Sequence, residues 1–591
     1  MKEFFKMMLA SCLGSLIVFG VCIFLVFSLI IGSIISVIES ADDRNTVTTI
    51  SQNSVLHLDL TKTIYERTPS ELNTYMGYNQ VMGADMVLKA ISMAKTDSKI
   101  RGIYLNTSAM YNGGWALTEE IRNAIIDFKE SGKFVYSYSD TYSQKAYYLS
   151  SVADSIFINP SGILEFKGIA AETIFIKDLL DKIDVDVELI RPCNNSFKSA
   201  GEMYTMKHMS EANKTQIRSY INNIWQHVSA DISAARNIPV GKLNNIANNL
   251  SAYLPNDAVN TGLIDRAAFE HDVFASMADI LDINYSNPDD IKFVKAKKYA
   301  ASDNSIESKN KIAVIYAQGN VKYGSGPDIN VYSSSITKAI NDAADNDKVK
   351  AIVLRVNSSG GAVIASEIMT NAIIRAKQKK PIVVSMSDVA ASAGYEISCY
   401  ANKIVAMPTT ITGSIGVFGI YPQVGGLLKN KLGIATDTVL TNRNAAALSI
   451  NRPLSYNSRS MLTRNVEEFY KTFCQRVADG RNLSVEYVDS IARGRVWTGT
   501  QAKELGLVDE LGGIDMALRI AAQEAAITNY SIIVYPKEKD AITEIMELFG
   551  EEMSANIVEK RSNSIIKYYK QMEELSNMEP IQARLPYFVE F

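Results

Sequence analysis

Ser392 is the residue of this sequence whose surroundings best suit covalent chemistry. It lies among small residues in the stretch Asp388–Tyr395, directly after an apolar strand and at the start of a helix. Small neighbours let a substrate backbone approach closely, and the first N–H groups of a helix can bind a developing oxyanion. A serine at a helix start is also a common N-cap. The pattern therefore leaves two interpretations, a nucleophile or a capping residue.

A serine nucleophile needs a base, and no histidine lies within 100 residues of Ser392. A lysine can take this role when burial lowers its pKa from about 10.4 toward neutrality. Lys198, in Asn195–Gly201, follows a predicted strand at Val187–Ile190 and stands among small and apolar residues. We interpret it as the general base, with a solvated surface lysine as the alternative.

The turn Asn357–Ala362 is a candidate for the oxyanion hole. It follows one predicted strand and precedes a helix, and its glycines allow positive φ angles that aim backbone N–H groups into a site. Gly360 and Ala393 would together supply two backbone donors. An ordinary helix-start turn is the alternative.

These residues lie on alternating strand and helix patterns, which indicate α/β units with parallel sheets. The predicted strands are Ile103–Leu105, Phe134–Tyr138, Ile312–Ala317, Ile352–Val356 and Ile382–Met386, and the predicted helices include Thr118–Lys129 and Ala362–Lys377.

An internal repeat strengthens the interpretation of the two candidate catalytic residues. An offset of 248 residues aligns Ser137–Pro160 with Ser385–Pro408 without a gap. The same offset places Gln144 opposite Ser392 and Ala446 opposite Lys198. The first copy thus has the amine without the serine, and the second has the serine without the amine. We infer a tandem duplication in which each copy keeps half of one site.

Composition excludes several classes of function. The net charge of −4 over 591 residues offers no broad basic surface for nucleic acid. The 5 cysteines form no CxxC pair and no disulfide framework. We therefore expect no metal site and no cofactor.

The N-terminus contains an uncharged run of 32 residues, Met7–Ile38, with lysines before it and acidic residues after it. About 20 apolar residues cross a bilayer, and positive flanks stay in the cytoplasm. The run predicts one transmembrane helix, hence a single-pass protein of the bacterial inner membrane with its catalytic body on the periplasmic side.

The chain is thereby divided into six predicted parts. They are a cytoplasmic N-terminus at 1–6, the transmembrane helix at 7–38, a linker at 39–50, the first repeat at 51–300 with the lysine, the second repeat at 311–540 with the serine, and a helical tail at 541–591.

Several segments resemble the signal peptide peptidase A (protease IV) family in its long, tandem, membrane-anchored form. The matching segments, in chain order, are NSFKSAGEMY (Asn195–Tyr204), VNSSGGAV (Val356–Val363), SDVAASAGYEIS (Ser387–Ser398), TGSIGVFG (Thr412–Gly419) and GRVWTGTQAKELGLVDELGG (Gly494–Gly513).

The resemblance implies a caseinolytic-protease/crotonase-like unit, a homotetramer, Ser392 as nucleophile, Lys198 as base, and backbone donors at Gly360 and Ala393. Ser359 stands where the family usually has proline, and Ala393 where glycine is common. We expect the last segment to be structural, and the glycines of Thr412–Gly419 to form tight turns.

The predicted function is a serine endopeptidase with a Ser–Lys dyad that degrades cleaved signal peptides and other apolar peptides. The alternatives are a non-catalytic membrane scaffold of the same fold and a crotonase-like acyl-CoA enzyme. The sequence leaves open whether the dyad forms within one protomer or between two.

Overall fold

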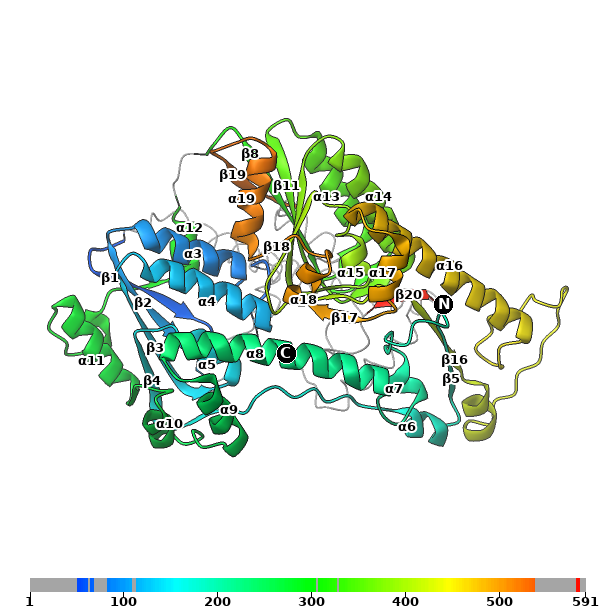
Figure 1. Cartoon of the computed structure of the whole chain (residues 1–591), viewed down its shortest axis with the longest axis horizontal. Coiled ribbons are helices and arrows are strands. Elements are labelled where there is room, and N and C mark those ends of the chain that lie inside the picture. The colour runs from blue at the N-terminus through cyan, green and yellow to red at the C-terminus, as the bar shows by residue number, and fades with distance from the viewer. Residues whose placement is uncertain are drawn as a thin grey trace, which may run out of the picture.

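The computed structural model describes residues 50–61, 64–68, 82–108, 113–303, 307–326, 329–536 and 581–584. Two mainly parallel sheets with covering helices form the body of the protein (Figure 1). The prediction of an α/β fold is confirmed.

The first sheet is parallel throughout and has the strand order β6-β4-β3-β2-β1-β7. Its strands are β1 (Ser54–Asp59), β2 (Ile100–Asn106), β3 (Phe134–Tyr142), β4 (Ser155–Leu164), β6 (Arg266–Ala267) and β7 (Phe293–Lys295). The helices of this part are α3 (Ala84–Thr96), α4 (Trp115–Lys129), α5 (Gln144–Ser150), α8 (Glu211–Arg236), α9 (Val240–Asn249), α10 (Pro255–Thr261), α11 (Glu270–Leu281) and α12 (Ala296–Ala301).

The second sheet has the order β17-β15-β13-β11-β8-β19, with β14 paired to β13 and β18 paired to β14. Its strands are β8 (Lys311–Gln318), β11 (Val349–Ser358), β13 (Ile382–Ala391), β14 (Lys403–Ala406), β15 (Ile411–Gly413), β17 (Val496–Thr498), β18 (Glu510–Leu511) and β19 (Ser531–Tyr535). Its helices are α13 (Ser333–Asp345), α14 (Val363–Lys377), α15 (Ala393–Glu396), α16 (Tyr456–Arg481), α17 (Val485–Ile491), α18 (Gly499–Glu504) and α19 (Ile514–Glu524).

The long helices α8 and α16 show why the two halves fold alike. Each has 26 residues, begins after a serine N-cap and ends at a left-handed asparagine. The serine side chain accepts a hydrogen bond from the first turn, and asparagine adopts the left-handed conformation more easily than most residues. Identical start and stop signals thus fix two helices of the same length. The exact boundaries of the two repeats stay a prediction.

A third sheet joins the halves, in the order β10-β9-β12-β20-β16-β5. Its strands are β5 (Asp186–Ile190), β9 (Val321–Lys322), β10 (Val331–Tyr332), β12 (Gly360–Ala362), β16 (Phe418–Gln423) and β20 (Ile581–Arg584). In Figure 1, β5 lies beside β16, and α8 runs back from this region toward the first sheet. The segment with α6 (Lys177–Lys182), β5 and α7 (Glu202–Thr205) is therefore an arm of the first half that reaches the second.

The hydrophobic cores also connect the halves. The core around the first sheet contains Leu56, Ile103 and Tyr147, and it also includes Ala391 and Val496 of the second half. Because apolar side chains of both halves share this core, separating them would expose buried surface to water.

Two predictions about the ends of the chain need comment. The segment 7–38 lies outside the described residues, and no helix of the described part is long and apolar enough to cross a membrane. By this finding, the predicted localisation as a single-pass inner-membrane protein is wrong. The longest described helices, α8 and α16, do not qualify because they carry charged residues along their length. Of the tail predicted as helical, the described residues Ile581–Arg584 form a strand, because they pair with two strand edges.

Candidate active site

Ser392 occupies a strained turn between β13 and α15. Its φ of 58° and ψ of −119° are rare for any residue except glycine. The turn is held by a hydrogen bond from the Ser392 N–H to the Gly413 carbonyl, 2.8 Å long. Strain of this kind persists only where the surrounding structure fixes it, and it is common at catalytic sites. Ser392 stands at the N-cap position of α15, but its side chain makes no capping hydrogen bond, which removes the interpretation of that side chain as a helix cap.

Lys198 lies in the loop between β5 and α7, and its Nζ is 2.7 Å from Ser392 Oγ. The same nitrogen donates hydrogen bonds to the Ser414 carbonyl at 2.9 Å and to Ser414 Oγ at 3.0 Å. Both Lys198 and Ser392 are fully buried. The two residues that the sequence analysis selected, 194 positions apart, are thus in direct contact within one chain.

Burial lowers the pKa of Lys198 well below the ordinary value of 10.5. Desolvation penalises the ammonium form, and no charge effect opposes it at this site. A neutral amine has a lone pair, so Nζ can accept the hydroxyl proton of Ser392 while its two N–H groups bind Ser414.

The lysine loop is held by residues of both halves. The Phe197 N–H donates to the Arg493 carbonyl at 3.1 Å, and Gln216 Nε2 donates to the Phe197 carbonyl at 3.0 Å. Gly494 packs directly against the lysine backbone, and a Cβ at Gly494 would lie 2.5 Å from Lys198 Cβ. The segment that begins at Gly494, expected to be structural, therefore also positions the candidate base.

The two predicted oxyanion residues lie next to the serine. A Cβ added to Gly360, whose φ is 101°, would lie 3.0 Å from both the Ala393 nitrogen and Ser392 Cβ. The Gly360 N–H donates to Ser358 Oγ at 3.2 Å. The turn and the start of α15 thus converge beside Oγ, and the donor roles of Gly360 and Ala393 stay a prediction.

Ser414 is a site residue that sequence reasoning missed. It has a φ of 50°, is fully buried, and supplies two of the acceptors around Lys198 Nζ. It lies in the Thr412–Gly419 segment, whose glycines were expected to form tight turns. Nothing in the spacing of that segment shows that a lysine about 200 residues earlier would contact it.

In the first half, Gln144 occupies the place that corresponds to Ser392. Its side-chain amide donates to the Gly168 carbonyl at 2.9 Å and accepts from the Gly168 N–H at 2.7 Å. In the second half, Ser392 Oγ lies 3.5 Å from the carbonyl of Gly416, the residue aligned with Gly168. The glutamine therefore fills its position with hydrogen bonds and provides no nucleophile there.

A buried network of charged side chains joins the two halves. Arg355 of β11 donates to Glu66 Oε2 at 2.8 Å, to Glu120 Oε2 at 2.6 Å and to Ser385 Oγ at 2.8 Å. Both carboxylates come from the first half and the guanidinium from the second. Such a pair has value mainly for specifying one arrangement, because its desolvation offsets much of its attraction.

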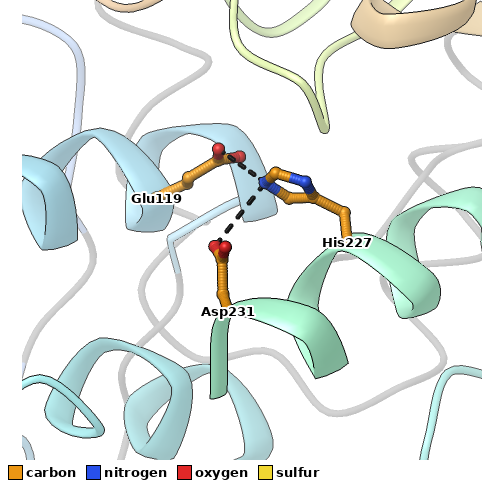
Figure 2. A group of neighbouring side chains, drawn as sticks. All are labelled: Glu119, His227 and Asp231. Atoms are coloured by element: carbon orange, nitrogen blue, oxygen red, sulfur yellow. Dashed lines mark hydrogen bonds and ion pairs between the residues drawn. The ribbon is translucent and has the colours of Figure 1, made fainter. Parts of the chain in front are cut away.

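A second cluster of side chains is formed by Glu119 of α4 with His227 and Asp231 of α8 (Figure 2). His227 Nε2 is 2.8 Å from Glu119 Oε1 and 3.6 Å from Asp231 Oδ2. Arg122 Nη1 lies 3.5 Å from the same Asp231 oxygen, and the Tyr148 hydroxyl donates to it. A metal ion would have to displace these partners, so we interpret the cluster as an ion-pair network between α4 and α8.

Comparison with known proteins gives matches over more than half of the chain. A model of peptidase family S49 matches residues 127–284 and 374–528, together more than half of the chain. Protease 4 of Salmonella typhi is 35% identical over 470 residues, covering 78% of this chain and 75% of that protein.

Two further relatives extend the match. Protease 4 of Haemophilus influenzae is 31% identical over 547 residues and covers 86% of either chain. The chloroplastic serine protease SPPA of Arabidopsis thaliana is 27% identical over 548 residues, covering 91% of this chain and 78% of that protein.

Proposed function

The chain belongs to peptidase family S49, and we propose that Ser392 and Lys198 are its nucleophile and general base. The protein is a serine peptidase, as its membership of this family and its Protease 4 relatives establish. The single observation that supports the dyad is the 2.7 Å contact between Lys198 Nζ and Ser392 Oγ in a fully buried environment.

The proposed mechanism follows from the neutral amine. Lys198 takes the hydroxyl proton as Ser392 Oγ attacks the peptide carbonyl, and the oxyanion is held by backbone N–H groups near Gly360 and Ala393. The ammonium then protonates the departing amine, which leaves an ester on Ser392. Lys198 next deprotonates a water molecule, whose attack releases the second product.

The proposed substrates are cleaved signal peptides and other apolar peptides. The support is the resemblance of the catalytic segments and the names of the relatives. The same resemblance supports the caseinolytic-protease/crotonase-like form of the α/β unit, which we also propose.

The test combines covalent labelling with activity. A serine-directed fluorophosphonate should label Ser392, and Ser392→Ala should lose both the label and peptidase activity while keeping its circular dichroism spectrum. Lys198→Met should retain the fold and lose activity. An unlabelled Ser392 in the folded wild-type chain would instead favour the scaffold alternative, and a crotonase-like enzyme would need acyl-CoA turnover that survives Ser392→Ala.

We also propose that copies of the chain associate head to tail. The second half has its own arm, residues 425–456, which contains exposed apolar side chains; these include Leu432 at 59%, Val439 at 98% and Ile450 at 52% exposure. By the 248-residue offset, segment 170–175 of the first half corresponds to β16, the strand on which the first arm docks. Ile174 in that segment is 51% exposed. The second arm of one copy would therefore dock on segment 170–175 of the next.

A contact of this kind is heterologous and closes into a ring, with four copies in the proposed assembly. Val439→Asp should shift the sedimentation coefficient to that of a smaller species. Ile280→Asp, at a side chain 43% exposed on α11, is the matched control and should leave it unchanged. Identical sedimentation of the Val439→Asp variant and wild type would contradict this contact.

A further inference from the structure

Asn195 is a fully buried side chain of the lysine loop to which the dyad contacts give no role. Its backbone closes the loop. The Asn195 N–H donates to the Pro192 carbonyl at 3.0 Å, and the Asn195 carbonyl accepts from the Lys198 N–H at 3.2 Å. This turn fixes the position of the asparagine relative to that of the candidate base.

Neither polar atom of the Asn195 side chain has a hydrogen-bond partner among the described residues. Oδ1 and Nδ2 are both buried and both unpaired. A buried amide in a folded protein is nearly always paired, either with a protein group or with an internal water molecule. Because the described part of the chain supplies no protein partner, the amide points to a small polar molecule bound beside it.

The amide and the candidate nucleophile approach the same residue, Gly416. A Cβ added to Gly416 would lie 3.0 Å from Asn195 Nδ2 and 2.9 Å from Gly494 Cα, so only a glycine allows this close approach. The Gly416 carbonyl lies 3.5 Å from Ser392 Oγ. A molecule held by the Asn195 amide at this glycine is therefore close to the reacting hydroxyl.

The first half shows what an amide can do beside the corresponding glycine. There the Gln144 side chain binds both the carbonyl and the N–H of Gly168. Asn195 approaches Gly416, which aligns with Gly168, without such a bond. The half without the serine thus pairs its amide with protein groups, whereas the half with the serine keeps an amide able to bind a small molecule.

The second step of the proposed reaction requires such a molecule, namely water. The water oxygen forms a bond to the ester carbonyl carbon and gives a proton to Lys198 Nζ. The bond from that carbon to Ser392 Oγ then breaks, and Oγ takes the proton back from Nζ. The rate depends on how well the water is held. Because Nζ already bonds to Ser392 and Ser414, another group must orient the water.

We propose that the Asn195 amide binds and orients the water molecule that hydrolyses the acyl-enzyme. Asn195 takes no proton itself, since Lys198 remains the base. The proposal rests on the proposed function, because an acyl-enzyme forms only if Ser392 is the nucleophile. It assigns Asn195 to deacylation and gives it no part in acylation.

Burst kinetics separate the two steps. The probe is the p-nitrophenyl ester of an N-protected alanine, mixed with the full chain in a stopped-flow instrument. The burst of p-nitrophenol gives the acylation rate, its amplitude counts the working sites, and the later steady rate gives deacylation.

Asn195→Leu keeps the branched shape of the side chain and removes both polar atoms. We expect its burst rate to stay within about threefold of the wild type and its steady rate to fall at least about tenfold, because the water is no longer held. Mass spectrometry should show the acyl group accumulating on Ser392. Hydroxylamine, a stronger nucleophile than water, should restore turnover.

Asn194→Leu is the matched control on the neighbouring asparagine of the same loop. The Asn194 side chain is exposed, and its Nδ2 donates to Asp489 Oδ1 at 2.9 Å. Both rates of this variant should stay within about threefold of the wild type, since surface substitutions have small effects. Asn195→Val, which is closer to asparagine in volume, gives the same comparison if Asn195→Leu does not fold.

Equal losses in the burst and steady rates of the Asn195 variants would overturn the proposal, because the asparagine would then serve only to place Lys198. Unchanged rates in these variants would overturn it as well. Failure of fluorophosphonate to label wild-type Ser392 would instead refute the proposed function, and the role of Asn195 in deacylation would fall with it.

Discussion

Replacing Gly494 with alanine should separate the candidate base from the nucleophile. Gly494 has a φ of 79°, and a Cβ there would lie 2.5 Å from Lys198 Cβ and 2.6 Å from the Lys198 nitrogen. Ordinary van der Waals contact begins near 3.4 Å. The Lys198 nitrogen and Cβ cannot rotate away as the end of a flexible side chain can. The new methyl group must therefore push the lysine backbone away by about 1 Å.

The expected loss of activity is large compared with the loss of stability. Misplacement of a catalytic group by about 1 Å can lower the rate about 100-fold. The positive φ by itself costs an alanine roughly 1–2 kcal/mol. We therefore expect kcat/KM of Gly494→Ala to fall at least about 100-fold while the protein remains folded.

Gly506→Ala is the matched control for backbone strain. Gly506 has a similar φ of 74°, but its nearest neighbour, Leu483 Cδ2, would lie at a comfortable 3.7 Å from the new Cβ. The assay is kcat/KM on a quenched fluorescent peptide, together with the rate of fluorophosphonate labelling at Ser392 and the thermal midpoint. Gly506→Ala should lose some stability and keep activity within about threefold.

Activity of Gly494→Ala within about threefold of the wild type would refute the reasoning. It would mean that the lysine loop adapts to the methyl group, or that Lys198 is not the base. Loss of activity in both variants to the same degree would assign the effect to backbone strain and would contradict the role of the Gly494 contact.

Three further predictions concern charge. Lys198 must be neutral to act as a base, and burial lowers its pKa. We therefore expect kcat/KM to rise with pH through that lowered pKa and to level off well below pH 10.5. A profile of kcat/KM that rises only near pH 10.5 would contradict this prediction. Arg355→Met leaves Glu66 and Glu120 buried without their cation and should lower the free energy of unfolding by about 3–5 kcal/mol in urea titrations, while a change under 1 kcal/mol would contradict the role of the network. Burial opposes the charged form of His227, but its hydrogen bond to Glu119 and the nearby carboxylates outweigh burial and raise the pKa of His227 above 6.5. The stabilisation that charged His227 gives the folded protein is therefore fully present below pH 6.5, and it is lost as the pH rises through the pKa of His227 in the folded protein. His227→Gln should therefore lower the thermal midpoint more at pH 5.5 than at pH 8.5, and an equal effect at the two pH values would contradict this.

The elements of the fold could be predicted wherever a local pattern decides them. Phe134–Tyr138 and Ile382–Met386 lie within β3 and β13, and Thr118–Lys129 within α4, because period and turn signals are properties of neighbouring residues. The pairing of Ser392 with Lys198 came from a different source, the comparison of two copies of one unit. Each copy showed what the other lacked, and the structure places these two residues in contact.

Contacts made by distant loops could not be predicted in this way. Ser414 accepts a hydrogen bond from Lys198, and Gly494 packs against the Lys198 backbone. Both contacts exist only because the arm of the first half crosses to β16. The strand β20 alternates apolar and polar residues over only the four positions Ile581–Arg584, and its conformation is set by the two edges on either side. The tail was predicted as helical from its charged run, which carries no information about these edges.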